Sequence, residues 1–275
     1  MSGVAPPARP AVRVTLGQLA VSEDHAANRL AVVDALRTAA RAHADLLVLP
    51  EYASGFDPRG VGPEHAEGLD GPFVRTLREH AAKTGVAVVA GTMLPGATPA
   101  RGVNAVVAVD GAGEVAGVYR KVHLYDAFGH RESDRLEAGS PDAAPLLLDL
   151  GGLRFGILTC YDLRVPESAR RLVDAGARVL VVPAAWAAGE LKAMHWRTLA
   201  VARAIENTAA VVAVGQAGRG GGGRSLLGAP GGVVGLERDD KPGIRTADIG
   251  GAALAAVRER TPSLRHRRYG VVPLP

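Results

Sequence analysis

The sequence predicts a layered α/β fold in one domain of residues 11–275. Strand-like and helix-like segments alternate from the start of the chain, a pattern typical of helices packed on sheets. No linker rich in Pro or Ser divides the 275 residues. We therefore expect two similar sheet layers sandwiched between helices. The first ten residues, with Pro6, Pro7 and Pro10, are interpreted as a disordered leader.

The first half of the chain is interpreted as two β-α-β units followed by a hairpin. Residues 11–19 alternate apolar and polar side chains, as a strand with one buried face does. Helical spacing of Leu30, Val33, Leu36 and Ala40 indicates the first helix. The predicted elements are, in order, a helix over 24–43, a strand over 45–49, a helix over 72–84, a buried strand over 86–90, and hairpin strands over 104–109 and 115–119.

The second half repeats this rhythm after an antiparallel pair of strands over 145–149 and 153–158. The predicted elements that follow are a helix over 167–175, strands over 179–182 and 210–215 around a helix over 191–207, short strands over 225–227, 233–236 and 244–248, and a helix over 252–258. The segment Gly218–Gly223 lacks the Lys-Ser or Lys-Thr of a phosphate loop. We interpret it as a mobile surface loop, with a pocket lid as the alternative.

Charge and hydropathy exclude several classes of partner. The formal net charge is +4, from 32 basic and 28 acidic residues that are scattered along the chain, so no nucleic-acid footprint is expected. The densest basic run, Arg265 to Arg268, is interpreted as a solvated or interface-pairing tail. No apolar stretch reaches the roughly 18 to 20 residues of a membrane span, and the N-terminus lacks a secretory signal pattern. We therefore expect a cytoplasmic protein that binds neither nucleic acid nor membranes.

The lone cysteine, Cys160, excludes an intramolecular disulfide and is either an inert core thiol or a reactive group. It follows an apolar strand and precedes a helix, and such a turn exposes a nucleophile. The dipole of the following helix can lower the thiol pKa, and backbone N–H groups there can hold an oxyanion. The alternative is a small buried apolar side chain.

Two charged residues lie at the ends of other predicted strands. Glu51 follows an apolar strand at its carboxyl end, where α/β sheets place ligands, and Lys121 closes the strand that ends at Arg120. Taken alone, Glu51 is interpreted as a surface acid and Lys121 as a charge that protects the edge of a sheet. Together with Cys160 they provide a base and acid, a cation for an oxyanion, and a nucleophile. His123 is interpreted as a structural histidine.

Three segments resemble the signature blocks of the nitrilase-like carbon–nitrogen hydrolases in sequence, order and spacing. These are Leu-Pro-Glu-Tyr at 49–52, Tyr-Arg-Lys-Val-His-Leu at 119–124, and Thr-Cys-Tyr-Asp-Leu-Arg-Val-Pro-Glu at 159–167. The similarity continues through 182–186 and 202–207 to Arg267 and Arg268, so that it covers nearly the whole chain from Val12.

The resemblance implies a four-layer α-β-β-α sandwich, a Glu-Lys-Cys site, a covalent thioester intermediate, no cofactor or metal, and assembly into homodimers or larger homo-oligomers. It also implies a second glutamate that holds the site together, and Glu132 occupies the matching segment. We expect the backbone N–H of Tyr161 to hold the oxyanion with Lys121. Trp186 either walls the substrate pocket or packs as an ordinary core residue.

Within this family, Cys-Tyr-Asp at 160–162 and Lys-Val-His-Leu-Tyr-Asp at 121–126 resemble the amidase branch that includes ω-amidase and deaminated glutathione amidase. This resemblance implies hydrolysis of a small linear amide with release of ammonia. The alternatives are hydrolysis of N-carbamoyl amino acids or of nitriles, and a catalytically silent binding protein on the same fold.

Overall fold

The computed structural model describes residues 11–274, so the predicted leader over 1–10 lies outside the described part of the chain. The elements are β1 (Ala11–Gln18), α1 (His25–Arg41), β2 (Leu46–Val48), η1 (Pro63–His65), α2 (Pro72–Thr84), β3 (Ala87–Pro95), β4 (Gly102–Val109), β5 (Val115–Arg120), η2 (Glu132–Asp134), β6 (Leu147–Leu150), β7 (Leu153–Ile157), η3 (Cys160–Arg164), α3 (Pro166–Asp174), β8 (Val179–Ala184), α4 (Lys192–Glu206), β9 (Ala210–Gly215), β10 (Leu226–Gly228), β11 (Val234–Glu237), β12 (Gly243–Gly250) and α5 (Gly251–Arg260).

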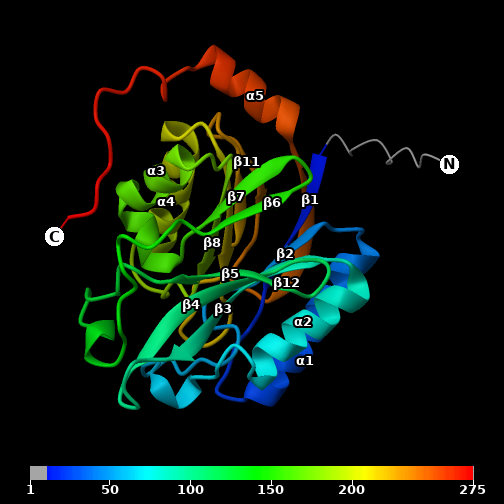
Figure 1. The fold of residues 1–275 in the computed structure, drawn as a ribbon, viewed down its shortest axis with the longest axis vertical. Coiled ribbons are helices and arrows are strands. Elements are labelled where there is room, and N and C mark those ends of the chain that lie inside the picture. The colour runs from blue at the N-terminus through cyan, green and yellow to red at the C-terminus, as the bar shows by residue number, and fades with distance from the viewer. Residues whose placement is uncertain (1–10, 275) are drawn as a thin grey trace.

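The strands form two six-stranded sheets, and helices cover the outer face of each (Figure 1). One sheet has the order β12-β1-β2-β3-β4-β5 and the other β11-β10-β9-β8-β7-β6. The strands β1, β2 and β3 are parallel, as are β7, β8 and β9, and antiparallel strands flank each parallel trio. Helices α1 and α2 lie on the first sheet, and α3 and α4 on the second. The four-layer α-β-β-α sandwich is thereby confirmed.

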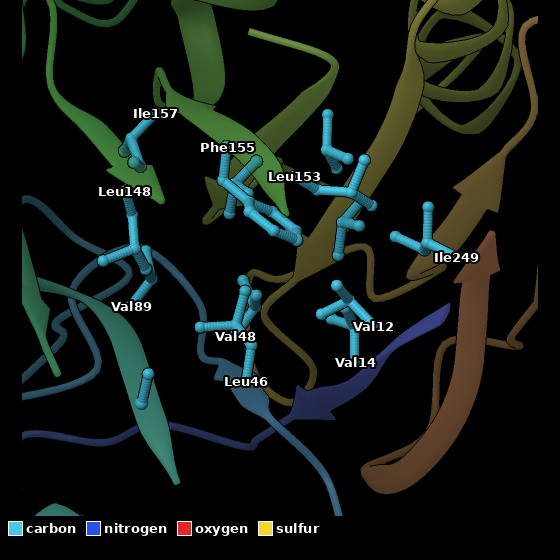
Figure 2. Close-up of a cluster of buried hydrophobic side chains, with 14 of the residues drawn as sticks. Val12, Val14, Leu46, Val48, Val89, Leu148, Leu153, Phe155, Ile157 and Ile249 are labelled. Atoms are coloured by element: carbon cyan, nitrogen blue, oxygen red, sulfur yellow. The ribbon is translucent and has the colours of Figure 1, made fainter. Parts of the chain in front are cut away.

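The main core lies between the two sheets (Figure 2). Because successive side chains of a strand point to opposite faces, Leu153, Phe155 and Ile157 of β7 face the other sheet. Buried side chains from both sheets meet them, including Val12, Val14, Leu46, Val48, Val89, Leu148 and Ile249. The opposite faces of the strands pack against the helices, which explains why the parallel strands are apolar throughout.

Local sequence signals account for several element boundaries. The Asp24 side chain accepts hydrogen bonds from the backbone N–H groups of Ala26 and Ala27 and so caps the start of α1. Helix α2 begins at Pro72, which has no N–H to satisfy, and ends at Gly85, whose φ of 72° suits glycine. These helices therefore begin and end close to the predicted positions.

Two sequence expectations about the first sheet and its helices are wrong. Leu30, expected on the apolar face of the first helix, is 69% exposed, because the buried face of α1 runs through Val32, Val33, Ala35, Leu36 and Ala39. The strand expected over 86–90 continues to Pro95, because β4 pairs with β3 along its whole length.

The C-terminal basic run is only partly solvated. Arg265, His266 and Arg268 are exposed, whereas Arg267 is partly buried and forms an ion pair with Asp174 at the end of α3. Within this run, Arg267 is therefore held against α3, while its three neighbours are exposed to solvent. Among the residues that the structure describes, no helix is both long enough and apolar enough to span a membrane.

Candidate active site

The first group of functional side chains lies at one edge of the β1–β5 sheet. Glu51 follows β2 after Leu49 and Pro50, and Lys121 directly follows β5. Strands β4 and β5 form a hairpin on β3, so the start of β4 and the end of β5 both lie at the carboxyl edge of β3. The backbone N–H of Lys121 donates to the carbonyl of Asn104 at 2.8 Å, which fixes the lysine at this edge.

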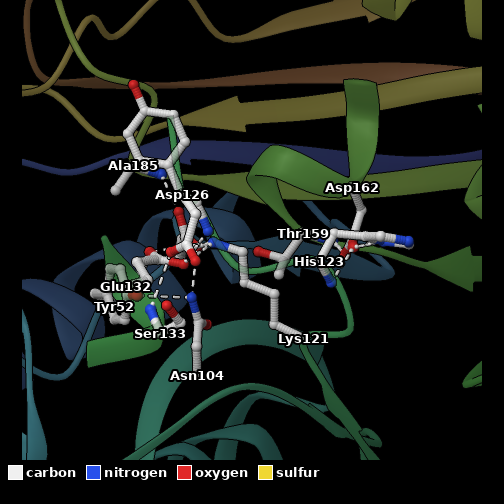
Figure 3. Close-up of polar contacts among 12 residues, drawn as sticks. Tyr52, Asn104, Lys121, His123, Asp126, Glu132, Ser133, Thr159, Asp162 and Ala185 are labelled. Atoms are coloured by element: carbon white, nitrogen blue, oxygen red, sulfur yellow. Dashed lines mark hydrogen bonds and ion pairs between the residues drawn. The ribbon is translucent and has the colours of Figure 1, made fainter. Parts of the chain in front are cut away.

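Two carboxylates hold the buried ammonium of Lys121 (Figure 3). The side chain of Lys121 is 0% exposed, and its Nζ lies 3.0 Å from Oε1 of Glu51 and 2.9 Å from Oε2 of Glu132. Burial disfavours the charge, but Glu132 and Glu51 outweigh it and hold the pKa of Lys121 well above its ordinary value. Lys121 and Glu51 are therefore both buried, and the alternative that they are surface charges is wrong.

Further hydrogen bonds fix the orientation of the Glu51 carboxylate. Its Oε1 also accepts from Nδ2 of Asn104 at 2.7 Å, and its Oε2 accepts from the backbone N–H of Ala185 at 2.7 Å. Glycine is required at Gly91 in β3, since a Cβ there would lie 2.4 Å from the Cα of Glu51. Glu51 is thus tied to both sheets and has no freedom to turn away.

Glu132 is held by groups other than the lysine. The hydroxyl of Tyr52 donates to its Oε1 at 3.0 Å, and the backbone N–H of Tyr125 donates to its Oε2 at 2.8 Å. Nδ2 of Asn104 donates in turn to the hydroxyl oxygen of Tyr52 at 2.7 Å. The segment between Lys121 and Glu132 therefore folds back so that both residues meet at one point.

Cys160 lies on a sharp turn between β7 and α3. It has a φ of 46°, which side-chain-bearing residues rarely adopt, and it begins the 3-10 helix η3. Its side chain belongs to the buried cluster beneath α3 and α4, and it interacts with the carboxylate of Glu51. The strand-to-helix turn predicted from the sequence is observed.

The thiol pKa differs from the expectation. Burial raises the pKa of Cys160 well above its ordinary value, and the Glu51 carboxylate raises it further, whereas Lys121 opposes the shift. The pKa is therefore raised and not lowered, because burial and the adjacent carboxylate set its direction. The thiol is consequently protonated at neutral pH and needs a base to become a nucleophile.

Asp162 connects the cysteine turn to the end of β5. Its buried carboxylate accepts hydrogen bonds from the backbone N–H of Thr159 at 3.0 Å and from the Tyr119 hydroxyl at 2.7 Å. It also contacts Nδ1 of His123 at 2.7 Å. His123 therefore lies against Asp162 and not in the cluster around Lys121, as expected of a structural histidine.

The two expected substrate-binding residues flank the cysteine. Tyr161 is partly exposed, and its ring centroid lies 5.3 Å from that of Tyr125. Trp186 is buried in the same apolar cluster as Cys160, with its ring 5.2 Å from that of Trp196. The structure brings Glu51, Lys121, Glu132 and Cys160 together, and both aromatic residues border them.

The segment Gly218–Gly223 is anchored near this site. The backbone N–H of Gly222 donates to the carbonyl of Trp186 at 2.7 Å, and that of Ala188 donates to the carbonyl of Gly220 at 3.3 Å. The segment therefore packs against the chain that follows Trp186, which is a position compatible with a pocket wall.

Sequence reasoning missed four contributors to the site. These are Tyr52, Asn104, Asp162 and the backbone N–H of Ala185. A signal existed for Asn104, which is a polar residue in an otherwise apolar strand, and for Asp162, which lies in the Cys-Tyr-Asp segment. Within residues 11–274, no group of three or more His, Cys, Asp or Glu side chains is arranged to hold a metal ion.

Comparison with known proteins finds a matching family model and relatives of similar sequence. Residues 13–259 match the family model described as carbon-nitrogen hydrolase. The chain is 36% identical to a deaminated glutathione amidase of Escherichia coli O157:H7 over 258 residues, which are 93% of this chain and 97% of the relative. It is 35% identical to a 2-oxoglutaramate amidase of Bacillus subtilis over 226 residues, covering 80% and 83% of the two chains.

The fold also matches solved structures. One is a mutant of the amidase from Nesterenkonia sp. AN1, with a TM-score of 0.77 and 27% identity, covering 96% of this chain and 99% of that one. That structure is described as showing covalent addition of the acetamide moiety of fluoroacetamide at the active site cysteine.

Proposed function

This chain belongs to the carbon–nitrogen hydrolase family, and we propose that it hydrolyses a small linear amide with Cys160 as the nucleophile. The observation that carries the proposal is the buried ammonium of Lys121, held between Glu51 and Glu132 beside the thiol. Both curated relatives described above are named as amidases. Burying the charges of Glu51 and Lys121 beside a partly buried Glu132 is costly for a fold, so their presence at one point favours a chemical role.

The first half of the proposed reaction forms a thioester. Glu51 takes the thiol proton of Cys160, and the sulfur attacks the carbonyl carbon of the amide. The oxyanion that develops is held by Lys121 and by the backbone N–H of Tyr161. The C–N bond then breaks, and the nitrogen leaves as ammonia with the proton that Glu51 had taken.

The second half removes the acyl group. Glu51, again ionised, takes a proton from a water molecule whose oxygen attacks the thioester carbonyl. The C–S bond breaks, and the proton returns to sulfur as the carboxylic acid is released. The hydrogen bonds from Asn104 and Ala185 fix the orientation of the Glu51 carboxylate. Glu132 acts as a positioning residue, because it contacts Lys121 and not the reacting atoms.

Ammonia release from a substrate panel tests the proposal. The panel contains simple linear amides, α-keto-acid ω-amides, N-carbamoyl amino acids and nitriles. We expect turnover of at least one amide class, a mass increase of the protein by one acyl group when turnover is quenched, and loss of both in Cys160→Ala. Cys160→Ser is expected to lose roughly three orders of magnitude, since an alcohol is a poorer nucleophile than a thiolate. Activity retained by Cys160→Ala would overturn the proposal, and no acylation by any compound would favour a silent binding protein.

We also propose that the protein is cytoplasmic and forms a homodimer or a larger homo-oligomer. The support for assembly is membership of a family whose members often pair through their sandwich faces. Sedimentation equilibrium of the purified chain measures the assembly, and fractionation of the producing cells measures the location.

A further inference from the structure

Two imidazole rings lie in contact beside the segment that follows Glu51. Nε2 of His25, the first residue of α1, lies 3.0 Å from Nδ1 of His65, the last residue of η1. The rings are nearly parallel, with 15° between their planes and 5.3 Å between their centroids. Nδ1 of His25 lies 3.0 Å from Oε1 of Glu67. The proposed mechanism uses none of these three side chains.

The partners decide which ring nitrogens carry protons. An ionised carboxylate only accepts, so Nδ1 of His25 carries a proton and donates it to Glu67. The contact between the two rings needs one proton, which His65 supplies when both rings are neutral and which either ring supplies when one is charged. When both rings are charged, both facing nitrogens carry a proton and the hydrogen bond is lost. The pair therefore accommodates one positive charge but not two.

Burial makes the second charge costly. The side chain of His65 is only 8% exposed. Burial lowers the pKa of His65 and the neighbouring His25 lowers it further, although nearby carboxylates oppose the shift. The charged side chains around the pair are Arg29 of α1, Glu64 and Glu67 beside it in the η1 segment, and Glu23, Asp57 and Arg59, of which Arg59 pairs with the other two.

The two rings pack directly on the backbone of Gly55. A Cβ at this position would lie 2.5 Å from Nε2 of His25 and 3.0 Å from Nδ1 of His65. No space therefore separates the hydrogen bond between the rings from the chain at Gly55, which is four residues after Glu51. Rings that move apart cannot keep this contact unchanged.

The segment 52–56 connects this contact with the candidate site. The hydroxyl of Tyr52 donates to Glu132, and the carbonyl of Tyr52 accepts from the backbone N–H of Gly55 at 3.0 Å. The next backbone N–H, that of Phe56, donates to the carbonyl of Ser22 at 2.9 Å. Tyr52 and Phe56 also pack in one apolar cluster. The segment thus has the paired rings on one side and a hydrogen bond of the site on the other.

We propose that His25 and His65 form a pH-sensitive switch, which holds segment 52–56 in place while at most one ring is charged and loosens it when both are. The loosening follows because the facing N–H groups then repel each other beside Gly55. Since Tyr52 lies in this segment, the loosened form holds Glu132 less firmly and turns over substrate more slowly. The effect on turnover rests on the proposed amide hydrolysis, whereas the switch itself does not.

Amide hydrogen exchange at pH 7 and pH 5 tests the switch. The measured quantity is the protection factor of the backbone N–H groups of Gly55 and Phe56, corrected for the pH dependence of intrinsic exchange. His65→Asn places near Nδ1 an amide that can donate to His25 and does not titrate. His80→Asn is the matched control, because His80 in α2 is another partly buried histidine whose pKa burial lowers, and it lies outside the pair.

We expect the wild-type protection factors to fall about tenfold or more between pH 7 and pH 5. A histidine whose pKa is lowered in the closed form stabilises that form above the ordinary pKa of about 6.5, and this contribution is lost as pH falls below it. In His65→Asn the factors are expected to stay within about threefold, and in His80→Asn to fall as in the wild type. Equal losses in the wild type and His65→Asn, or no loss in the wild type, would overturn the proposal.

An NMR titration of the wild-type protein decides the question if His65→Asn does not fold. The ring protons of the two histidines and the amide proton of Gly55 are followed from pH 7.5 to pH 4.5. We expect the pair to take up its two protons in separate steps, with the Gly55 resonance moving in the second. Uptake in a single step, or a second step that leaves Gly55 unchanged, would overturn the proposal.

The effect on turnover is measured with any amide that the wild-type protein hydrolyses. Between pH 7 and pH 5, kcat is expected to fall at least about threefold less in His65→Asn than in the wild type and in His80→Asn. Equal losses in all three proteins would overturn the control of turnover by the pair. If no amide is hydrolysed, the proposed function fails, and the exchange and NMR results still decide whether the switch exists.

Discussion

At the scale of single residues, the site is a cluster of charged side chains in contact with one another inside the protein. The ammonium of Lys121 faces two carboxylates, so the triad carries one net negative charge beside a thiol that burial keeps protonated. A buried ion triad is weak support for stability but fixes the position of each member. The negative charge left on Glu51 is what the thiol proton needs as an acceptor.

The role of Glu132 is tested by Glu132→Gln. The single amide oxygen can replace only one of the two carboxylate oxygens, so either the Tyr52 hydroxyl or the Tyr125 backbone N–H loses its acceptor, and the side chain no longer offers a charge to Lys121. We expect kcat to fall by about 10² to 10³. Without the Glu132 charge, the ammonium of Lys121 is held less firmly in the position where it stabilises the oxyanion. KM is expected to change much less. Asp126→Asn, in the same segment but exposed, is the control and is expected to retain full activity. A kcat within about threefold of the wild-type value would contradict the role.

At the scale of elements, one short turn decides where the nucleophile stands. The 3-10 helix η3 (Cys160–Arg164) keeps Cys160 at positive φ, and Asp162 within it bonds both to Thr159 before the cysteine and to Tyr119 in β5. The turn that carries the thiol is therefore joined to the strand that leads to Lys121. Asp162 keeps the two halves of the site in register without touching either reacting group.

Replacement of Asp162 by Asn tests this connection. Asn has the same shape, but its NH2 group cannot accept the hydrogen bonds of Thr159 and Tyr119, so one or more buried donors lose their partner. We expect the free energy of unfolding to fall by about 2 to 3 kcal/mol and kcat to fall with it. Urea unfolding and steady-state kinetics measure the two effects. Asp149→Asn, on an exposed ion pair with Arg154, is the control and is expected to cost less than about 1 kcal/mol. Equal stability of the two variants would refute the connection.

At the scale of the whole molecule, the packing of two sheets encloses the ionisable groups. Tyr52 and Tyr119 have pKa values held well above the ordinary one, mainly by burial and by the nearby carboxylates of Glu132 and Asp162. Cys160 and Lys121 also have raised pKa values. All four groups therefore bind a proton more tightly in the folded than in the unfolded chain, and the protein carries a built-in sensitivity to alkaline pH.

This sensitivity predicts how stability changes with pH. Each raised pKa contributes stability that is fully present below the unfolded-state pKa and is lost as pH rises above it. The unfolded values are about 8.5 for cysteine and about 10 for tyrosine and lysine. We expect the free energy of unfolding to decline from about pH 8.5 and more steeply above about pH 10. In Cys160→Ala the first part of the decline is expected to disappear. Urea unfolding curves at pH 7, 9 and 10.5 measure this, and constant stability up to pH 10.5 would show that the buried groups are not protonated as inferred.

Much of the fold was predictable because its signals are local. Caps such as Asp24 and Gly85 and the apolar runs of the parallel strands depend on neighbours in the chain, so most element boundaries agree with the structure within a few residues. The errors arose where a distant partner decides the outcome. Strand β3 is longer because β4 pairs with it, and Leu30 is exposed because α1 turns a different face to its sheet.

By itself the sequence determined the layered α/β fold, and it placed Glu51, Lys121 and Cys160 at the ends of strands, because periodicity and strand-end position are properties of short segments. Only the tertiary structure decided that these side chains meet and that Asn104 and Asp162 hold them. The pKa of the Cys160 thiol also depends on the tertiary structure, because burial and a carboxylate more than a hundred residues away in sequence set it. Electrostatic energies depend on distance in space and on exclusion of water, and neither is defined until both sheets have packed.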